Sequence, residues 1–198
     1  MTTESKTYPV TLKGELTIPP GRWLWIFKWL LAIPHLIILC FLEIAFFVVC
    51  VIAFFAILFT GKFPKGLFDF NFGVLRWGWR VGFYSYSALG TDKYPPFSLD
   101  HVPDYPAYLD IPYPENLSRG LIWVKWWLLA IPHWIIIGVF RYLLPILLII
   151  VALCLLFVGR YPKDLFKLAI GVNRWTYRVM AYVSLMRDEY PPFRFWDS

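Results

Sequence analysis

Four arginines occur as two pairs with the same spacing, and they are the residues of this sequence best suited to bind a ligand. Arg76 and Arg80 are four positions apart, and Arg174 and Arg178 repeat that spacing. Residues four apart lie on one face of a helix, so each pair brings two guanidinium groups together. A guanidinium offers phosphate a planar fork of donors. The pattern therefore predicts a site for an anion or an anionic phospholipid headgroup. The alternative is that these arginines bind carboxylates or backbone carbonyls and hold helices together.

Two histidines stand at equivalent places, each directly after a proline, in Pro34-His35 and Pro132-His133. Two such histidines could ligate a haem or a metal between two halves of the protein. No carboxylate or cysteine stands near them at ligand spacing, so we expect no metal site and no cofactor other than this haem alternative. The simpler interpretation places both Pro-His pairs at a bend near the edge of a membrane, where the imidazole bonds a carbonyl freed by the proline.

One charge interrupts each of two long apolar runs. Glu43 lies within Pro34–Phe59, and Arg141 lies at the equivalent place within Pro132–Val158. An unpaired charge in such surroundings is costly. We therefore expect an ion pair between Glu43 and Arg141 where the two halves pack together.

The sequence carries no pattern of an enzyme. It has no Gly-x-Ser-x-Gly, and no glycine-rich phosphate loop follows an expected strand. The net charge of +6 is spread between apolar stretches instead of gathering on one polar face, which speaks against a nucleic-acid partner. The three cysteines all lie inside apolar runs, so they do not indicate a disulfide framework.

The composition indicates that lipid surrounds these residues. Hydrophobic residues make up 59% of the 198 positions and charged residues only 16%, and the mean hydropathy is +0.58. A membrane-spanning helix needs about 20 mostly apolar residues. Both apolar runs exceed that length, and neither stands at the N-terminus as a targeting signal would. A soluble enzyme is therefore not expected.

The chain is an internal duplication. Trp29–His35 recurs as Trp127–His133, and Gly61–Lys65 recurs with small changes as Gly159–Lys163. Upstream of these motifs the two copies differ in register by one residue. We divide the chain into a tail (1–7), a first repeat unit (8–98), a linker (99–104) and a second repeat unit (105–196).

Each unit contains the same expected elements in the same order. An extended segment (Tyr8–Ile18, Tyr105–Tyr113) precedes an aromatic helix at the membrane interface (Arg22–Ile33, Arg119–Ile131). A proline-bent transmembrane helix, a tight turn and an arginine-striped helix follow (the last being Leu67–Leu89 and Leu165–Met186). The fold expected is thus an all-α integral membrane protein with short β segments outside the bilayer.

The number of crossings stays open in the sequence. The arginine-striped helices either cross with the stripe buried or lie along the interface, and we favour four crossings. More Lys and Arg then flank the termini than the turns, which favours cytoplasmic termini. The extended segments are too short to be stable alone, so we expect them to pair with each other or with another chain.

The two units resemble the prokaryotic membrane family called domain of unknown function 4389. The resemblance rests on Ala-Ile-Pro-His, on Gly-Val-x-Arg-Trp-x-x-Arg and on Tyr-Pro-Pro-Phe, each present twice. It implies a multi-pass protein of the prokaryotic plasma (inner) membrane and supplies no activity. The second copy departs from the first at Lys167, Ala169 and Asn173.

Three functions follow as hypotheses. The first is a non-catalytic scaffold or accessory subunit that binds membrane or envelope components, or a second copy of itself, through its strands and aromatic helices. The second is an anionic lipid- or anion-binding protein, or a small transporter, that uses the arginine stripes. The third is a haem-binding redox protein that uses the two histidines.

Overall fold

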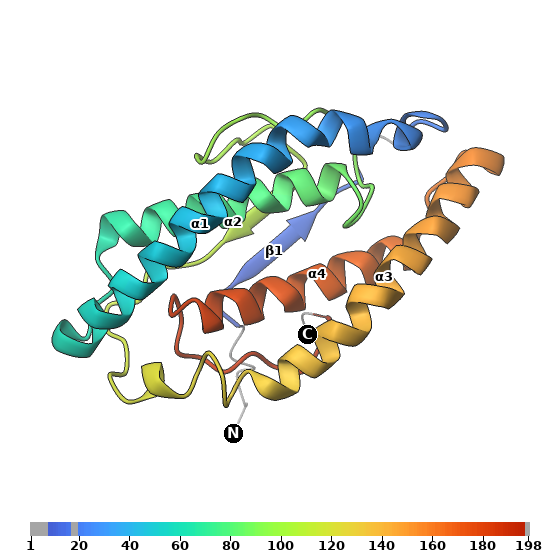
Figure 1. The fold of residues 1–198 in the computed structure, drawn as a ribbon. Coiled ribbons are helices and arrows are strands. Elements are labelled where there is room, and N and C mark those ends of the chain that lie inside the picture. The colour runs from blue at the N-terminus through green and yellow to red at the C-terminus, as the bar shows by residue number, and fades with distance from the viewer. Residues whose placement is uncertain (1–7, 17–19, 197–198) are drawn as a thin grey trace, which may run out of the picture.

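The computed structural model describes residues 8–16 and 20–196, and the tail 1–7 lies outside the described residues. The chain is mainly helical, as predicted, with one short β-ribbon (Figure 1). Its elements follow in the order β1 (Thr11–Gly14), η1 (Leu24–Ile26), α1 (Lys28–Thr60), α2 (Lys65–Tyr84), β2 (Ala107–Asp110), η2 (Leu121–Trp123), α3 (Ile131–Phe157) and α4 (Lys163–Val183), where η denotes a 3₁₀ helix.

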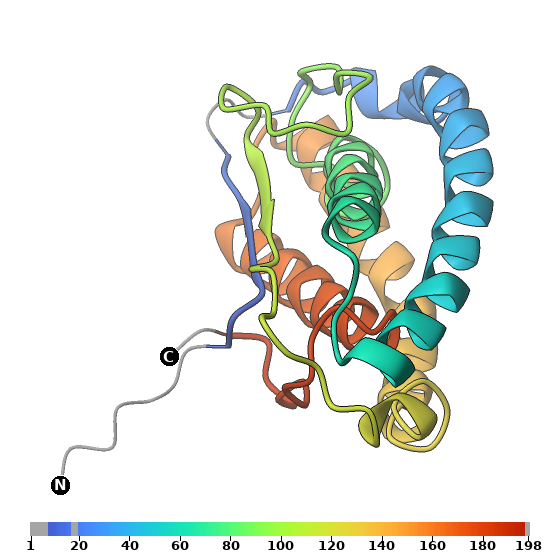
Figure 2. The same ribbon diagram turned by 90° about the vertical axis from the view of Figure 1, so that its left-hand side faces the viewer.

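The elements form layers. The ribbon lies on one side, α2 and α4 lie in the middle, and α1 lies on the far side (Figure 2). The ribbon contacts α2 and α4, α1 packs on α2, and α3 packs on α4. In Figure 1 the two long helices α1 and α3 lie in front of α2 and α4 and run in opposite directions. The molecule therefore has one outer layer of apolar helices and an opposite outer layer of strands.

The two repeat units exchange their strands. β1 pairs antiparallel with β2, with Thr11 opposite Asp110. β1 belongs to the first unit but packs on α4 of the second, whereas β2 packs on α2 of the first. Each strand buries alternate apolar side chains, such as Leu12 and Leu109, against the helices and turns Lys13 and Tyr108 outward. Neither unit therefore covers its own helix, and the two units form one core.

Tyrosine hydroxyls at the start of each exchanged segment secure the exchange. The Tyr8 hydroxyl donates to the Glu189 carbonyl at 2.9 Å, and the equivalent Tyr105 hydroxyl donates to the Lys93 carbonyl at 3.1 Å. Burial raises the pKa of both phenols, so they remain protonated donors at neutral pH. Each contact joins one unit to the other.

The predicted separate aromatic helix of the first unit is wrong. Only Leu24–Ile26 forms a 3₁₀ turn, and the residues from Lys28 onward belong to α1, which continues through Pro34 to Thr60. Pro34 removes one intrahelical hydrogen bond near the start of a 33-residue helix, and its fixed φ fits helical geometry. That single loss does not divide the helix.

The second unit differs from the first at the same place. Lys28-Trp29 of the first copy corresponds to Lys125-Trp126-Trp127, so Trp126 is an additional residue. One extra residue rotates the apolar face of a helix by about 100°. The predicted helix Arg119–Ile131 is accordingly reduced to η2 and turns, and α3 begins at Ile131. Pro132 then occupies the first turn of α3, where no backbone donor is needed.

The outer helices expose most of their apolar surface. By length and composition α1 and α3 are both able to cross a membrane. α1 buries only a narrow stripe that includes Ala32, Leu39 and Ala53. Most of its other side chains face outward, and Phe41 is 69% exposed. On α3 the Ile135 side chain is 65% exposed.

Candidate functional site

The first arginine pair binds the chain that follows the first unit. The Arg80 side chain is buried, and its guanidinium donates to the carbonyls of Ser98 and Asp100, the latter at 3.0 Å. Arg76 is partly exposed, donates to the Leu99 carbonyl at 3.4 Å and lies 3.9 Å from the Phe72 ring centroid. Both arginines therefore hold the segment 98–100 against α2.

The second arginine pair binds carbonyls of the exchanged β1 segment. Arg174 donates to the Leu12 carbonyl at 3.0 Å and to the Phe195 carbonyl at 3.4 Å. Arg178 donates to the Val10 carbonyl at 3.4 Å, with its guanidinium 5.2 Å from the Tyr8 ring centroid. All four arginines thus bind backbone carbonyls, which is the structural alternative among the two roles expected. An anion in addition stays a prediction.

Each histidine lies in its own aromatic cluster. His35 stacks on Phe97 with ring centroids 3.9 Å apart, and its Nδ1 accepts from Trp77 Nε1 at 3.2 Å. His133 stacks on Phe193 at 4.5 Å and lies beside Trp175 and Tyr190. Both histidines are fully buried, and His35 Nε2 and both ring nitrogens of His133 have no hydrogen-bond partner in the described part of the chain, so the expected bond to a freed carbonyl is not formed.

The Tyr-Pro-Pro-Phe motifs explain these clusters. Each motif follows the arginine-striped helix of its unit, and its phenylalanine stacks on the histidine of the same unit, Phe97 on His35 and Phe193 on His133. The two clusters share no residue, so the structure does not bring His35 and His133 to a common site. Among the described residues no group of three or more His, Cys, Asp and Glu side chains is placed to hold a metal.

Glu43 and Arg141 are both exposed on the outer helix layer. Within residues 8–16 and 20–196 no ion pair joins them. Glu43 instead lines a cavity of about 310 Å³ among α1, α2 and α4, which Tyr177 and Met180 also line. The pairing expected from their equivalent positions is not formed.

Two ion pairs that the sequence analysis did not predict each join a buried lysine to a partly exposed aspartate. Lys28 Nζ lies 2.9 Å from Asp92 and donates to the Thr91 carbonyl at 2.7 Å. Lys125 pairs in the same way with Asp188 and donates to the Arg187 carbonyl at 2.8 Å. Burial lowers the pKa of Lys125, and Asp188 opposes that shift. The sequence contained a signal for these pairs, because an aspartate stands two positions before Tyr-Pro-Pro-Phe in both units and the lysine also recurs.

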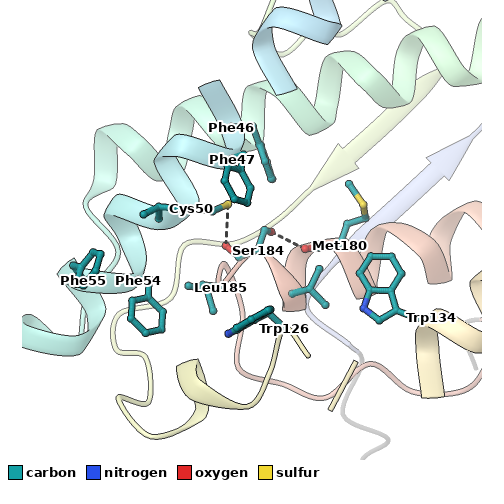
Figure 3. Close-up of a pocket in the computed structure, with 12 residues that line it drawn as sticks. Phe46, Phe47, Cys50, Phe54, Phe55, Trp126, Trp134, Met180, Ser184 and Leu185 are labelled. Carbon is teal, nitrogen blue, oxygen red and sulfur yellow. Dashed lines mark hydrogen bonds between the residues drawn. The ribbon is translucent and has the colours of Figure 1, made fainter. Parts of the chain in front are cut away.

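An apolar pocket of about 590 Å³ opens between α1 and the start of α3 (Figure 3). Its floor is the end of α4. Residues from three segments line it: Phe46, Phe47, Cys50, Val51, Phe54 and Phe55 of α1, Trp126 and Trp134 around the start of α3, and Met180, Val183, Ser184 and Leu185 of α4 and beyond. The smaller cavity beside Glu43 shares Phe46 and Met180 with it, so the two adjoin along α1.

The thiol and the hydroxyl group in the lining of this pocket are already engaged. The Cys50 thiol lies 3.8 Å from the Ser184 carbonyl, and the Ser184 hydroxyl donates to the Met180 carbonyl at 2.6 Å (Figure 3). The pocket therefore offers a ligand apolar surface and little hydrogen bonding. Its chemistry fits a hydrocarbon chain better than a polar substrate.

The extra tryptophan contributes to this pocket. Trp126, which has no counterpart in the first unit, forms part of the wall. In the second unit, Leu148 stands where the first has Cys50, and it packs with Val151, Leu155, Leu89 and Tyr161 in a closed cluster. The pocket thus arises where the two copies differ, which the repeat pattern alone does not reveal.

Comparison with known proteins agrees with the internal duplication. No curated protein and no solved structure matches this chain. A family model described as a domain of unknown function, DUF4389, matches residues 22–98 and again residues 121–194. Together the two matches cover more than half of the sequence, and each contains one histidine cluster and one arginine pair. The chain therefore belongs to the DUF4389 family and carries two tandem copies of its domain.

Proposed function

We propose that this protein is a non-catalytic membrane protein that holds a lipid acyl chain in the pocket between α1 and α3. The observation that carries the proposal is the pocket itself, with a volume of about 590 Å³ and a lining of aromatic and aliphatic side chains. This volume lies within the range of about 300–1,000 Å³ usual for ligand sites.

The surroundings of the pocket support a lipid ligand. The largest apolar patch on a soluble monomer is typically about 300–600 Å². Here the exposed apolar side chains run along the whole of α1 and of α3, and they include Phe41, Phe47, Ile135 and Ile149. A surface of this kind is stable in hydrocarbon and unstable in water, so the pocket opens where acyl chains are present.

The arginine stripes give less support to a lipid headgroup site than the pocket gives to a chain site. Each of the four arginines already donates to a carbonyl of the segments that cover α2 and α4, although Arg76 Nε and Arg80 Nε are buried without a partner among the residues that the structure describes. A ligand there would have to displace these bonds. The haem alternative has no observation in its favour, because aromatic rings enclose each histidine separately.

A scaffold role remains the second candidate, and the ribbon favours it. Among residues 8–16 and 20–196 the sheet has two strands, so each strand has an outer edge. Carbonyls of the β1 segment are already bound by side chains: Val10 by Arg178, Leu12 by Arg174 and Lys13 by Trp79. The edge of β2 is the better place for an added strand.

Two tryptophan substitutions test the lipid proposal. Val51 lines the pocket and is 43% exposed, whereas Val48 lies one turn earlier on the same helix, outside the pocket, and is 50% exposed. Each variant is placed in membranes that contain a phospholipid with a photoactivatable acyl chain. The membranes are illuminated, the protein is extracted, and the crosslinked peptides are measured by mass spectrometry. Val51→Trp should lower crosslinking to the pocket peptides several-fold, and Val48→Trp should leave it unchanged. Equal crosslinking in the two variants would contradict the proposal.

A further inference from the structure

We propose that the protein lies within one leaflet of the bilayer, with α1 and α3 in the plane of the membrane and the β1–β2 ribbon in the water above them. This inference rests on the proposed membrane location. It replaces four crossings by none, and it identifies the α1–α3 layer as the surface that contacts lipid.

The position of the ribbon carries the argument. Arg174, in the middle of α4, donates to the Leu12 carbonyl, and Trp79 of α2 donates to the Lys13 carbonyl at 3.1 Å. The ribbon therefore lies beside the central part of the helices instead of beyond their ends (Figure 1). Helices that crossed the bilayer would carry the ribbon to the depth of the hydrocarbon.

The ribbon is unsuited to that depth. Its outward side includes Lys13 and Glu15, both exposed, and partly exposed Asp110. A charged side chain at the bilayer centre costs about 2.5–3.5 kcal/mol even on insertion scales. Open strand edges exposed to lipid do not occur in the hydrocarbon region, because their backbone groups find no partner there. A spanning orientation would impose both costs.

The in-plane orientation removes these costs. The two outer layers differ in their charge. After Lys28, α1 and α3 contain only Glu43 and Arg141 as charged residues, whereas exposed Asp100 and Asp104 lie in the segment between α2 and β2. With the helices flat, the apolar layer faces acyl chains and the ribbon layer faces water.

The length of α1 agrees with this orientation. Thirty-three residues at a rise of about 1.5 Å each extend roughly 50 Å, well beyond the hydrocarbon thickness of about 30 Å. Tryptophans stand before both long helices, Trp23 before α1 and Trp127 before α3. These two regions lie at opposite ends of the molecule, since α1 and α3 are antiparallel (Figure 1). Tryptophans at both ends fit an in-plane layer and a spanning layer equally, so in this comparison only the length of α1 favours the in-plane orientation.

The two orientations differ in where the turns lie. The turn after α1 contains Lys62 and the turn after α3 leads to Lys163, and both lysines are exposed. Because the long helices are antiparallel, a spanning orientation of this structure places the two turns on opposite sides of the membrane. The four crossings expected from the sequence place both turns opposite the strands. Only the in-plane orientation places Lys13, Lys62 and Lys163 on one side.

The experiment labels these three lysines in the full-length protein. Sealed vesicles of both orientations are treated with a membrane-impermeant amine reagent, and modification of each lysine is measured by mass spectrometry. A second measurement uses the substitutions Lys13→Cys, Lys62→Cys and Lys163→Cys, each in a background with the three native cysteines replaced by alanine, and an impermeant maleimide. We expect all three positions to react in one vesicle orientation and to be protected in the other.

The outcomes separate the two proposals. If Lys62 and Lys163 react from opposite sides, or if both react from the side opposite Lys13, the in-plane orientation is overturned and the lipid proposal stands. If alkaline carbonate releases the protein from the vesicles, the membrane location itself fails and both proposals fail with it.

Discussion

Replacing Arg80 should destabilise the protein far more than replacing Arg76, although the two arginines belong to the same stripe. Arg80 is fully buried and bonds two carbonyls of the segment 98–100. Arg76 is partly exposed, makes one long bond to the Leu99 carbonyl and stacks on Phe72. The sequence pattern alone would predict the same loss of stability for both substitutions.

The expected sizes follow from these contacts. Hydrogen bonds from a charged group contribute about 1.5–3 kcal/mol each. Arg80→Ala removes two such bonds, and since water can reach the freed carbonyls in part, we expect a loss of roughly 3 kcal/mol at the low end of the range. Arg76→Ala removes one weak bond and a cation–π contact, together roughly 1 kcal/mol. For a chain of this size 1 kcal/mol shifts the Tm by about 2–4 °C, so we expect shifts of about 6–12 °C and about 2–4 °C.

The assay is thermal unfolding in one detergent at one scan rate, followed by tryptophan fluorescence, with bound phospholipid per folded protein measured on the same preparations. Arg80→Lys should recover part of the loss, because an ammonium can still bond one of the two carbonyls. If Arg80→Ala and Arg76→Ala shift the Tm equally, the assigned carbonyl contacts are not what holds this segment. If Arg80→Ala leaves the Tm unchanged and removes bound anionic phospholipid, the arginines serve a ligand.

Three further substitutions test other parts of the structure. Gly73→Ala should cost about 1–3 kcal/mol, because its Cβ would lie 2.8 Å from Leu99 Cβ, whereas Gly138→Ala in α3, with nothing within 4 Å, should gain about 0.5–1 kcal/mol; urea unfolding measures both, and equal effects would contradict the packing assigned to Gly73. Asp188→Asn should cost about 3–5 kcal/mol because it leaves the buried Lys125 charge unpaired, whereas Lys125→Met should cost roughly 1–3 kcal/mol because the Asp188 carboxylate left behind is partly exposed. The double variant should lose less than the sum of the two in a double-mutant cycle, and strict additivity would mean that the pair is not coupled. Deleting Trp126 should restore the register of the first copy and extend α3 toward Lys125, which slower amide hydrogen exchange over 125–130 would reveal; unchanged exchange would show that the extra residue does not interrupt the helix.

The sequence predicted the periodic features of the fold well. The duplication, the two long apolar helices, the following arginine-striped helices and the turns between them all occur, and α2 and α4 begin within two residues of the expected positions. These features depend on local patterns of apolar residues, glycine and proline. The expectation that the two extended segments need each other is also met by the β1–β2 ribbon.

The partners of the candidate residues were not predictable in the same way. The sequence placed Arg174 and Arg178 on one helix face, but their acceptors are Leu12 and Val10, more than 160 positions away in the chain. The ion pair predicted between Glu43 and Arg141 from their equivalent positions is also not formed. Two residues at equivalent positions of a repeat occupy the same place in their own units. That equivalence does not determine the distance between the two residues in the folded protein.

The sequence by itself determined that two copies of one unit, each with an apolar helix and an arginine-striped helix, make up this chain. Tertiary structure alone decided that the copies exchange strands, that the arginines bind carbonyls and that a pocket opens beside Trp126. The physical reason is that helix periodicity depends on neighbours within a few residues, whereas a buried donor is satisfied by whichever acceptor the packed chain brings to it. The same packing sets the ribbon opposite the apolar helices, and this arrangement of layers is not encoded in the order of elements along the chain.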